Sequence, residues 1–479
     1  MKSRIALALA LGIAGLGILG CSGDDDSGGG GGTSGTGGTS GTGGTAGASG
    51  AGGGAGQSSV PIVDDALDGN CPAGSKLPGT GVGPGKDLFK VTLDDPNAVC
   101  NDGSPGIMYI RRAVDATKEG DWVIHLQAGS GCSSWQVCRD RWCSYNTRYD
   151  AAKMSSNWAP AAMSGGGMLA RRPSNAFGGA NHVFLYYCSS DSWTGKQGDV
   201  VLDDPDGAGP SFRLHFRGFQ ILQAAIQALK GGATSDDKSV TLPKLSNASR
   251  VLLAGSSAGS TGATHALDWF REQVPKAQVV GTFDSILDPL PEDVDDPTVR
   301  AAWEVGIKHR YEEAFVNLYD AHLDESCVAA HQGNAPELCG LGSHVRLHHV
   351  TTPFFDRQDL SDPVQFGYFS SAGGSIQQLA NAIYKTSKRF ADIKTTAEEK
   401  SAIARVPGVH VSNCGQHIAL LNDIWFGVAA TGSATVELEN GTPITLHDAM
   451  VSWIAGNPVQ AIDTNPSSIA VCAATTSDQ

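Results

Sequence analysis

The sequence has few basic residues for its length. Lys and Arg number 34 against 49 Asp and Glu, and the formal net charge of the 479 residues is −15. Binding to nucleic acid depends on a concentrated positive surface that neutralises phosphates. The acidic balance therefore argues against a nucleic-acid partner, and it offers no general attraction for a polyanionic substrate.

The N-terminus also lacks a hydrophobic run long enough to span a bilayer comfortably. The apolar segment at residues 5–19 is broken only by glycines and is too short for a membrane helix. Lys2 and Arg4 precede it, which is the layout of a secretory signal peptide. A small residue stands directly before Cys21, so this segment resembles a bacterial lipobox, in which the cysteine is lipidated. An ordinary signal peptide cleaved nearby is the alternative.

We therefore expect residues 1–20 to be a lipoprotein signal peptide and Cys21 to be the lipidated mature N-terminus. Residues 21–59 are rich in Gly, Ser, Thr and Ala with almost no large apolar side chain, which predicts a disordered linker. Residues 60–479 show no second low-complexity boundary and no evident repeat, which predicts one enzyme domain. The expected product is an exported, monomeric lipoprotein of the bacterial cell envelope, at the outer membrane or cell surface. Only its lipid would contact the membrane.

Closely spaced cysteine pairs of the kind that structural zinc sites use are missing. Apart from the lipobox cysteine there are ten: Cys71, Cys100, Cys132, Cys138, Cys143, Cys188, Cys327, Cys339, Cys414 and Cys472. An even number in an exported chain predicts up to five disulfides, with Cys132–Cys138 and Cys327–Cys339 as local candidates. The spacings of Cys132, Cys138 and Cys143 do not fit a zinc site. We expect no metal and no cofactor.

Short apolar segments alternate with helical patterns over much of the chain. The segments that look like buried strands are residues 122–126, 182–187, 251–254, 279–283 and 409–411. Apolar residues recur at helical spacing in 216–230 and 258–274, and residues 231–249 and 289–297 have the composition of loops. This alternation indicates βαβ units, and hence an α/β fold with a mainly parallel central sheet flanked by helices.

The strongest local signal is Gly255-Ser256-Ser257-Ala258-Gly259, which follows a strand pattern and precedes a helical one. G-x-S-x-G in this context is the nucleophile elbow. The turn is so tight that the residues two before and two after the serine must lack bulk, and glycine stands at both places. The positive end of the following helix favours developing negative charge. We predict Ser257 as the nucleophile and assign no such role to Ser256.

A serine nucleophile needs a histidine base, and the base needs a carboxylate that orients it. In folds with this elbow the order along the chain is serine, acid, histidine. His417 is preferred because it stands in a polar loop directly after the strand pattern at residues 409–411. His410 lies inside that apolar segment, and His348 and His349 precede the segment expected to carry the acid.

The orienting acid is expected near a short strand pattern at residues 350–355. Catalytic groups of an α/β sheet stand at strand ends and in the loops that follow them. Asp356, Asp359 and Asp362 all follow this strand. Asp284 and Asp288 follow an earlier strand, directly after the nucleophile helix. Spacing hardly separates Asp356 from Asp362, so both remain candidates on this ground.

Acyl transfer also needs backbone N–H donors that stabilise the negative oxygen of the intermediate. A glycine-rich turn follows the strand pattern at residues 122–126. We predict Gly129 and Ser130 on this turn as donors, together with Ala258 next to the nucleophile. A plain surface turn is the alternative.

Several motifs together resemble the pectin acetylesterase and Notum family of carboxylesterases, over residues 87–424. They are residues 125–132 (HLQAGSGC), 187–195 (YCSSDSWTG), 216–218 (FRG), the elbow at 255–259, and 413–417 (NCGQH). The acid segment is similar too: the family has T-P-x-F, six residues and then Asp, and the same count from Thr352-Pro353-Phe354-Phe355 ends at Asp362. The resemblance therefore implies Asp362 as the acid. Gln127 and Ala128 depart from the family's Glu and Gly, which puts the pocket shape in doubt but leaves the backbone donors in place.

The resemblance implies an α/β-hydrolase-like fold with long disulfide-braced insertions and no metal. It implies hydrolysis of ester-linked acyl groups, and the predicted residues suit a secreted serine carboxylesterase that forms an acyl-enzyme. We favour acetyl esters of pectin or a related polysaccharide as substrates. A Notum-like deacylase of longer acyl esters is one alternative. A surface lipoprotein that binds polysaccharide without catalysis is the other.

Overall fold

The computed structural model describes residues 59–75, 87–145, 151–393 and 406–463, apart from Thr431 and Glu439. The predicted signal peptide, Cys21 and nearly all of the predicted linker lie outside the described residues. Within these ranges, no helix is long and apolar enough to cross a bilayer. One cluster of buried apolar side chains extends from Val63 to Ile462, so distant parts of the chain share a core.

A ten-stranded sheet, in the order β14-β11-β10-β9-β8-β3-β5-β2-β1-β4, forms the centre of the described molecule. Its strands are β1 (Leu88–Thr92), β2 (Ile107–Arg111), β3 (Asp121–Leu126), β4 (Ala162–Met163), β5 (Asn181–Leu185), β8 (Arg250–Ser256), β9 (Gln278–Asp284), β10 (Phe354–Asp359), β11 (Gly408–Ser412) and β14 (Gln460–Ile462). The strands from β14 to β5 run parallel, while β2, β1 and β4 are antiparallel to their neighbours. The fold class is the predicted one: mainly parallel, with an antiparallel margin.

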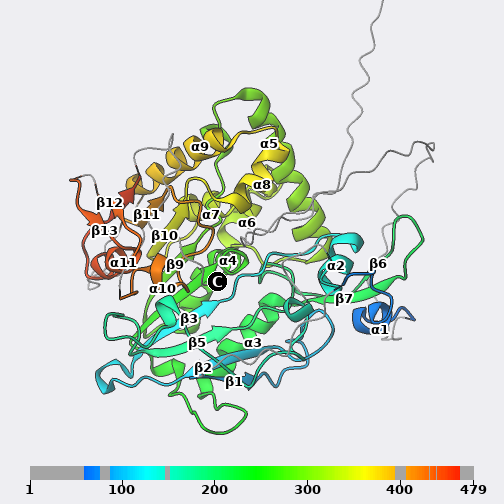
Figure 1. Cartoon of the computed structure of the whole chain (residues 1–479), viewed down its shortest axis with the longest axis horizontal. Helices are drawn as coiled ribbons and strands as arrows, with labels where there is room; N and C mark the ends of the chain where they lie inside the picture. Colours follow the sequence, from blue (N-terminus) through cyan, green and yellow to red (C-terminus); the bar gives the residue numbers. More distant parts are fainter. Residues whose placement is uncertain are drawn as a thin grey trace, which may run out of the picture.

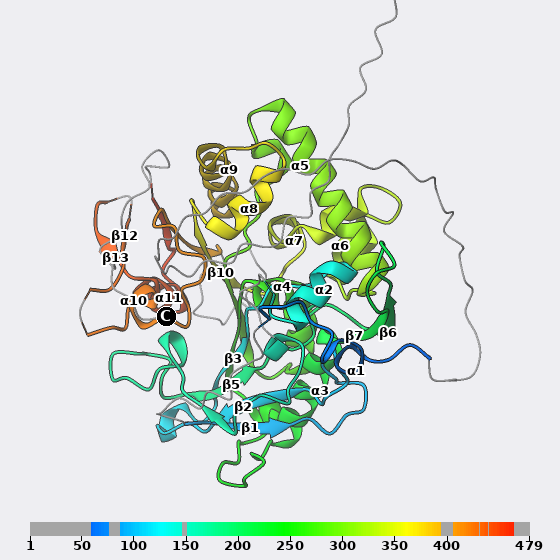
Figure 2. The same cartoon turned by 45° about the vertical axis from the view of Figure 1, so that its right-hand side comes forward.

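Helices surround the sheet (Figure 1). They are α1 (Val63–Leu67), α2 (Trp135–Trp142), α3 (Gly218–Gly231), α4 (Ala258–Gln273), α5 (Pro297–Arg310), α6 (Glu325–Ala330), α7 (Gly342–His348), α8 (Pro363–Ser371), α9 (Ile376–Arg389), α10 (Asp423–Phe426) and α11 (Leu446–Ile454). Helices α5, α8 and α9 gather at the top of Figures 1 and 2. Helices α1 and α2 pack together beside the hairpin of β6 (Gln197–Leu202) and β7 (Phe212–Phe216). A second hairpin pairs β12 (Val436–Glu437) with β13 (Pro443–Ile444).

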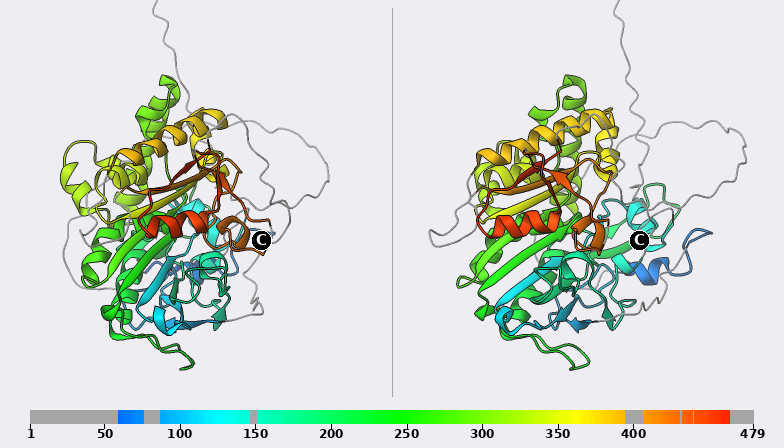
Figure 3. Two further views of the ribbon diagram at one scale, coloured as in Figure 1. Left: turned by 90° about the vertical axis from the view of Figure 1, so that its left-hand side faces the viewer. Right: turned by 60° about the vertical axis from the view of Figure 1, so that its left-hand side comes forward.

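Helices α4 and α11 lie on opposite faces of the sheet, as the side chains of β10 show. Phe354 is level with Gly281 of β9, which lies against Leu267 of α4. Successive strand residues point to opposite faces. Phe355 therefore points the other way, and its ring packs against Trp453 of α11 with 5.8 Å between centroids. Figure 3 shows α11 across the near face of the twisted strands. Cover on both faces explains why these parallel strands are almost wholly buried.

Most of the strands and helices that the sequence predicts are present, although many others were not predicted. Strands β3, β5, β8, β9 and β11 and helices α3 and α4 match the predicted segments to within a few residues. The predicted strand at residues 350–355 is wrong in its bounds, because the observed β10 runs from Phe354 to Asp359. Pro353 cannot donate to a sheet ladder, and the two threonines before it bond instead to the carboxylate of Asp268. Strands β1 and β2 were not predicted.

Disulfides brace the loops around the sheet, as the family resemblance implies. The described bonds are Cys71–Cys143, Cys100–Cys188, Cys132–Cys138 and Cys327–Cys339. The two local pairs predicted from spacing are therefore confirmed. Cys132–Cys138 closes the loop that follows β3, which is the turn expected to hold the backbone donors.

Candidate active site

The segment around Ser257 is a sharp turn between β8 and α4. Ser257 has φ 52° and ψ −118°, a conformation that costs free energy for a residue with a side chain. Its N–H donates to the carbonyl of Asp284 at 2.9 Å. A methyl group on Gly255 would overlap the Gly259 carbonyl, and one on Gly259 would overlap the Leu126 carbonyl. Both flanking glycines are therefore sterically required, as the motif predicts.

Ser257, His417 and Asp362 lie in one hydrogen-bonded row. His417 Nε2 is 2.8 Å from Ser257 Oγ, and His417 Nδ1 is 2.8 and 3.0 Å from the two carboxylate oxygens of Asp362. The Asp362 side chain is fully buried, while the His417 side chain is 12 % exposed. The row thus begins at a buried carboxylate and ends at a hydroxyl on the wall of a cavity.

Other donors fix the orientation of the Asp362 carboxylate. Asp362 is the N-cap of α8, and its Oδ1 accepts from the N–H groups of Val364 at 2.8 Å and Gln365 at 3.2 Å. Its Oδ2 accepts from Gln358 Nε2 at 3.1 Å. These three donors and the start of α8 fix the direction in which the carboxylate faces His417.

The rival acid, Asp356, lies elsewhere. It sits within β10, and its carboxylate pairs with Arg346 at 2.5 Å, both side chains being buried. Burial raises the pKa of Asp356 to about 6, although Arg346 opposes that shift. Among the other histidines considered, His410 is buried in β11, and burial lowers its pKa to about 3. His348 and His349 end α7 and its cap. Of these residues, the structure brings none into the row with Ser257.

Asp284, another candidate for the acid, binds the loop after β11 that carries His417. Its Oδ2 accepts from the N–H groups of Ala419 at 2.8 Å and Leu420 at 2.9 Å and from Ser256 Oγ at 2.9 Å. Arg357 Nη1 donates to the carbonyl of His417 at 2.8 Å. These buried contacts fix the backbone that carries the imidazole. This network was not predicted. Its one sign in the sequence is the presence of Arg357 and of the carboxylates of Asp284, Asp356 and Asp359 in or beside apolar strands.

Asp359, the third candidate acid, fixes the other end of the same loop. Its Oδ2 accepts from Ser412 Oγ at 2.8 Å and from the N–H of Cys414 at 2.9 Å. Its Oδ1 accepts from the N–H of Gly415 at 2.9 Å. Asp284 at the end of β9 and Asp359 at the end of β10 therefore hold the loop. Asp362, the N-cap of α8, contacts the imidazole.

The predicted donor turn after β3 is held from two sides. Ser130 has φ 54°, and its carbonyl accepts from the hydroxyl of Tyr187 at 2.6 Å. The carbonyl of Gly129 accepts from Arg141 of α2 at 2.6 Å. A side chain on Gly129 would overlap the Tyr187 ring, so glycine is required there. The backbone of the turn is thus fixed by α2 and by the segment after β5.

A cavity of about 90 Å³ opens beside Ser257. Its lining includes Ser130, Gly131 and Ala258, so two of the three predicted donor residues share a cavity with the serine. Gly129 stands one residue before this lining, and Gly131 was not predicted. The other lining residues come from the 187–195 motif, from α4, and from α5, α7, α8 and the segments beside them: Ser192, Thr261, Ile286, Asp288, Arg310, Phe315, Gly340, Gly342, Val364 and Tyr368. Arg310 pairs with Asp288 at 3.2 Å there, so the wall is partly polar.

A model of the pectinacetylesterase family matches residues 87–473. The chain belongs to the pectinacetylesterase family. It is 26 % identical to the palmitoleoyl-protein carboxylesterase NOTUM of Homo sapiens over 399 residues, 80 % of this chain and 72 % of that protein. The NOTUM of Drosophila melanogaster is 27 % identical over 357 residues, 72 % of this chain but only 46 % of the fly protein. Pectin acetylesterase 5 of Arabidopsis thaliana is 27 % identical over 284 residues, 56 % of each chain.

The fold agrees with this membership. The solved structure of the Wnt deacylase Notum from Drosophila superposes with a TM-score of 0.56 at 22 % identity, covering 79 % of this chain and 97 % of that one. At such identity the likeness speaks for the fold alone. The family and these curated relatives are all named for the hydrolysis of carboxylic esters.

The most specific of the pectinacetylesterase-like motifs, residues 187–195, is a structural support beside the site. Asp191 accepts from the N–H groups of Trp193 at 3.0 Å and Gly218 at 2.6 Å and from Ser189 Oγ at 2.7 Å. It thereby joins this motif to the F-R-G motif at the start of α3. A side chain on Gly218 would overlap Asp191 Oδ1. Burial raises the pKa of Asp191 to about 6. Trp193 Nε1 donates to the carbonyl of Gln127 at 2.9 Å, beside the donor turn.

Proposed function

We propose that this chain is a serine carboxylesterase in which Ser257 is the nucleophile, His417 the general base and Asp362 the acid that orients it. The observation that carries the proposal is the hydrogen-bonded row from Asp362 through His417 to Ser257 at a strained elbow. A serine hydroxyl is a weak nucleophile until an adjacent base accepts its proton. His417 lies 2.8 Å from Ser257 Oγ and 2.8 Å from Asp362, so both contacts are at hydrogen-bond distance.

In this mechanism Ser257 Oγ attacks the carbonyl carbon of the ester while His417 Nε2 takes the hydroxyl proton. The tetrahedral intermediate collapses, and His417 gives that proton to the leaving alcohol. Water, deprotonated by His417, then attacks the acyl-enzyme and releases the carboxylic acid and free serine. Asp362 accepts from His417 Nδ1 and so holds the imidazole in the orientation that both transfers need.

Backbone N–H groups of Gly129 or Ser130, together with that of Ala258, are proposed to stabilise the oxyanion. Ser130 and Ala258 line the cavity beside Ser257, which supports their part in this role. Ala258 is the first residue of α4, where the helix dipole favours negative charge. Losing one such donor costs about 3 kcal/mol of transition-state stabilisation in other hydrolases.

The size of the cavity favours a short acyl group. Its volume of about 90 Å³ is small beside the roughly 300–1,000 Å³ of typical ligand pockets, which supports an acetyl group rather than a long acyl chain as the bound group. We propose acetyl esters of pectin or a related polysaccharide as substrates. The alternative, deacylation of longer acyl esters, is supported by likeness to carboxylesterases whose names specify a palmitoleoyl group.

The test compares hydrolysis of p-nitrophenyl acetate by the wild type, Ser257→Ala and Ser256→Ala. We expect Ser257→Ala to lower kcat by roughly 10⁴-fold or more, as removal of a nucleophile does elsewhere. Ser256→Ala is the matched control: its hydroxyl contacts Asp284 and His125 rather than His417, so most activity should survive. Equal rates for wild type and Ser257→Ala would rule out the assigned nucleophile and favour a scaffold that only binds polysaccharide.

Acyl length is tested on the wild type with acetyl, butyryl and octanoyl esters of p-nitrophenol. The cavity leads us to expect kcat/KM at least tenfold higher for acetyl than for octanoyl. A preference for octanoyl would move the proposal to the longer-acyl alternative while leaving the catalytic row intact.

We also propose that the protein is exported and anchored by a lipid on Cys21. Persistent disulfides are typical of oxidising compartments, so the four described bonds support export. The anchor itself is testable by fractionation: Cys21→Ser should move the protein from membranes to the soluble fraction, and retention on membranes would refute the anchor.

A further inference from the structure

Histidines gather at the ends of α6 and α7, away from the catalytic row. His331 caps the C-terminus of α6, His344 lies on α7, and His349 directly follows α7. The disulfide from Cys327 of α6 to Cys339 ties α6 to the short helix at Pro336–Gly340 that leads into α7. A bond across 12 residues thus holds the two histidine-bearing segments together.

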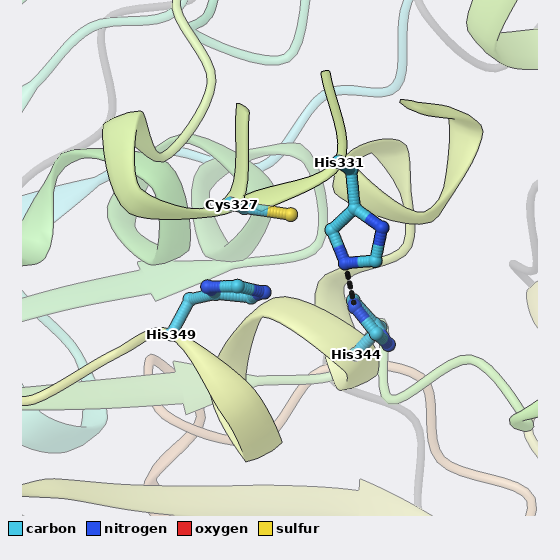
Figure 4. A group of neighbouring side chains, drawn as sticks. All are labelled: Cys327, His331, His344 and His349. Atoms are coloured by element: carbon cyan, nitrogen blue, oxygen red, sulfur yellow. Dashed lines mark hydrogen bonds between the residues drawn. The ribbon is translucent and has the colours of Figure 1, made fainter. Parts of the chain in front are cut away.

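The imidazoles converge on one point (Figure 4). One ligand atom from each of His331, His344, His349 and Cys327 can be chosen so that all lie within 4.8 Å of one another. The Nε2 atoms of His331 and His344 face each other at 3.0 Å. Two nitrogens that bind one tetrahedral zinc ion at 2.0–2.1 Å stand roughly 3.3 Å apart, so small side-chain movements would suffice.

Neighbouring groups leave the inward nitrogens free to accept. His331 Nδ1 lies 3.2 Å from the carbonyl of Asn334, which can only accept, so Nδ1 carries the proton. His349 Nδ1 lies 3.2 Å from Ser326 Oγ, whose own proton goes to Asp324. In both rings the lone pair is then on Nε2. Metal-binding histidines in proteins are oriented by such second contacts.

The charge of the cluster also suits a cation. Asp324 and Glu325 stand at the start of α6, where their carboxylates add negative potential. The close approach of His331 and His344 is held by one hydrogen bond.

We propose that His331, His344 and His349 bind one divalent transition-metal ion of the Zn²⁺ type. Three imidazole nitrogens suit Zn²⁺, Ni²⁺ or Cu²⁺ and do not suit Mg²⁺ or Ca²⁺, which prefer oxygen ligands. Cys327 is engaged in its disulfide, so water would complete the coordination. The site neither depends on the proposed esterase mechanism nor shares a residue with it.

The position of the site suggests what the ion would stabilise. Gly340 and Gly342, at the junction between the short helix and α7, line the cavity beside Ser257. An ion that joins the end of α6 to α7 would restrict the movement of this part of the cavity lining, together with the Cys327–Cys339 bond. No metal was expected from the cysteine spacing or from the family resemblance, and no local spacing indicates this site because its histidines come from two separate segments.

Isothermal titration of the metal-free, disulfide-intact protein with ZnCl₂ tests the proposal. We expect one ion per chain, with affinity at least tenfold weaker in His344→Ala and in His331→Ala. Zn²⁺ should also raise the Tm of the wild type by several degrees, because a ligand that binds only the folded state stabilises it, and should raise that of His344→Ala much less. Mg²⁺ should have no effect.

Two controls separate this site from other histidines. His309→Ala removes an exposed imidazole from α5, and His417→Ala removes the imidazole beside Ser257; both should bind Zn²⁺ as the wild type does. The urea unfolding curve of each variant without metal shows whether it folds. The proposal is overturned if the wild type binds no Zn²⁺, if His344→Ala and His331→Ala bind it with unchanged affinity, or if His417→Ala is the variant that loses it.

Discussion

At the scale of single residues, two aspartates six positions apart show how environment separates identical side chains. Asp356 is enclosed within β10 and paired with Arg346, whereas Asp362 stands at the start of α8 facing His417. Removing one partner of a buried ion pair leaves the other charge uncompensated, which costs about 3–5 kcal/mol. Removing the acid that orients a catalytic imidazole chiefly affects the rate.

We therefore predict opposite effects for Asp362→Asn and Asp356→Asn. Asp362→Asn should lower kcat by roughly 10³–10⁴-fold, because an amide there can favour the wrong imidazole tautomer. Asp356→Asn should lower the free energy of unfolding by several kcal/mol and leave kcat within a few-fold of the wild type. Steady-state kinetics and urea unfolding on both variants provide the measurements.

The pair of variants also provides its own control. Each changes one carboxylate to an amide in the same part of the fold, so a general effect of the substitution would appear in both. If Asp356→Asn loses activity as completely as Asp362→Asn while remaining folded at the assay temperature, the division between an orienting acid and a structural ion pair is wrong.

Residues of the row could be predicted, whereas residues that support it could not. Ser257 and His417 follow from a local motif and from chain order, and the family resemblance added Asp362. Arg357 and Asp284 act through contacts between β9, β10 and the loop after β11. Their partners lie far away in sequence, so no spacing rule indicates them.

At the scale of elements, the turn after β3 that is proposed to hold the oxyanion donors is positioned by α2. The helix contacts the turn twice, through Arg141 to the carbonyl of Gly129 and through the disulfide Cys132–Cys138. Cys71–Cys143 joins the other end of α2 to the N-terminal segment. The cysteines of Cys132–Cys138 are 6 positions apart in the sequence, and those of Cys71–Cys143 are 72 apart. In the chain-entropy model the longer loop gives the larger contribution to the free energy of unfolding.

This difference predicts that activity and stability respond separately to the two disulfides. The double variant Cys132→Ser/Cys138→Ser should lose about 2 kcal/mol of stability and at least tenfold in kcat, because the donor turn loosens. Cys71→Ser/Cys143→Ser should lose about 4 kcal/mol with kcat nearly unchanged. Urea unfolding and ester hydrolysis measure the two effects. Unchanged kcat in the first variant would show that the turn does not need its disulfide.

Element bounds were least predictable where tertiary contacts satisfy charges. The sequence of β10 is Phe-Phe-Asp-Arg-Gln-Asp, which no hydrophobic pattern marks as a buried strand. It is buried because Arg346 pairs with Asp356, and Arg357 lies near Asp284 and Asp359. Strands such as β8, which consist of apolar residues and small ones, need no partner of this kind and were predicted nearly to the residue.

At the scale of the whole molecule, the sheet encloses ionisable groups whose charged forms are disfavoured. Burial lowers the pKa of His125, His182 and His410 to about 3 each. Outside the strands it also lowers the pKa of His265 and His344 to about 3 and that of His322 to about 4. It raises the pKa of Asp191 and of Asp356 to about 6. Unfolding returns all these groups to water, where histidine titrates near 6.5 and aspartate near 3.9. Folding is therefore linked to proton binding.

The direction of this linkage can be predicted. Between pH 6 and pH 4 the unfolded chain protonates these six histidines, while the folded chain keeps them largely neutral, so their contribution to stability is lost as pH falls. The two aspartates act oppositely, because the folded chain protonates them first. The histidines outnumber the aspartates, so the free energy of unfolding should fall as the pH is lowered below 6, by about 1.4 kcal/mol per pH unit for each net proton.

Urea unfolding at pH 7, 6, 5 and 4.5 measures this slope, and His125→Leu tests its origin. His125 stacks on Phe184 with 5.7 Å between ring centroids, and an apolar side chain of similar size can occupy its place. The variant removes one of the six histidines, so it should make the slope shallower by about 1.4 kcal/mol per pH unit while leaving the fold intact. Stability that rises on acidification to pH 5, or a slope that His125→Leu leaves unchanged, would contradict the assignment of acid sensitivity to these buried histidines.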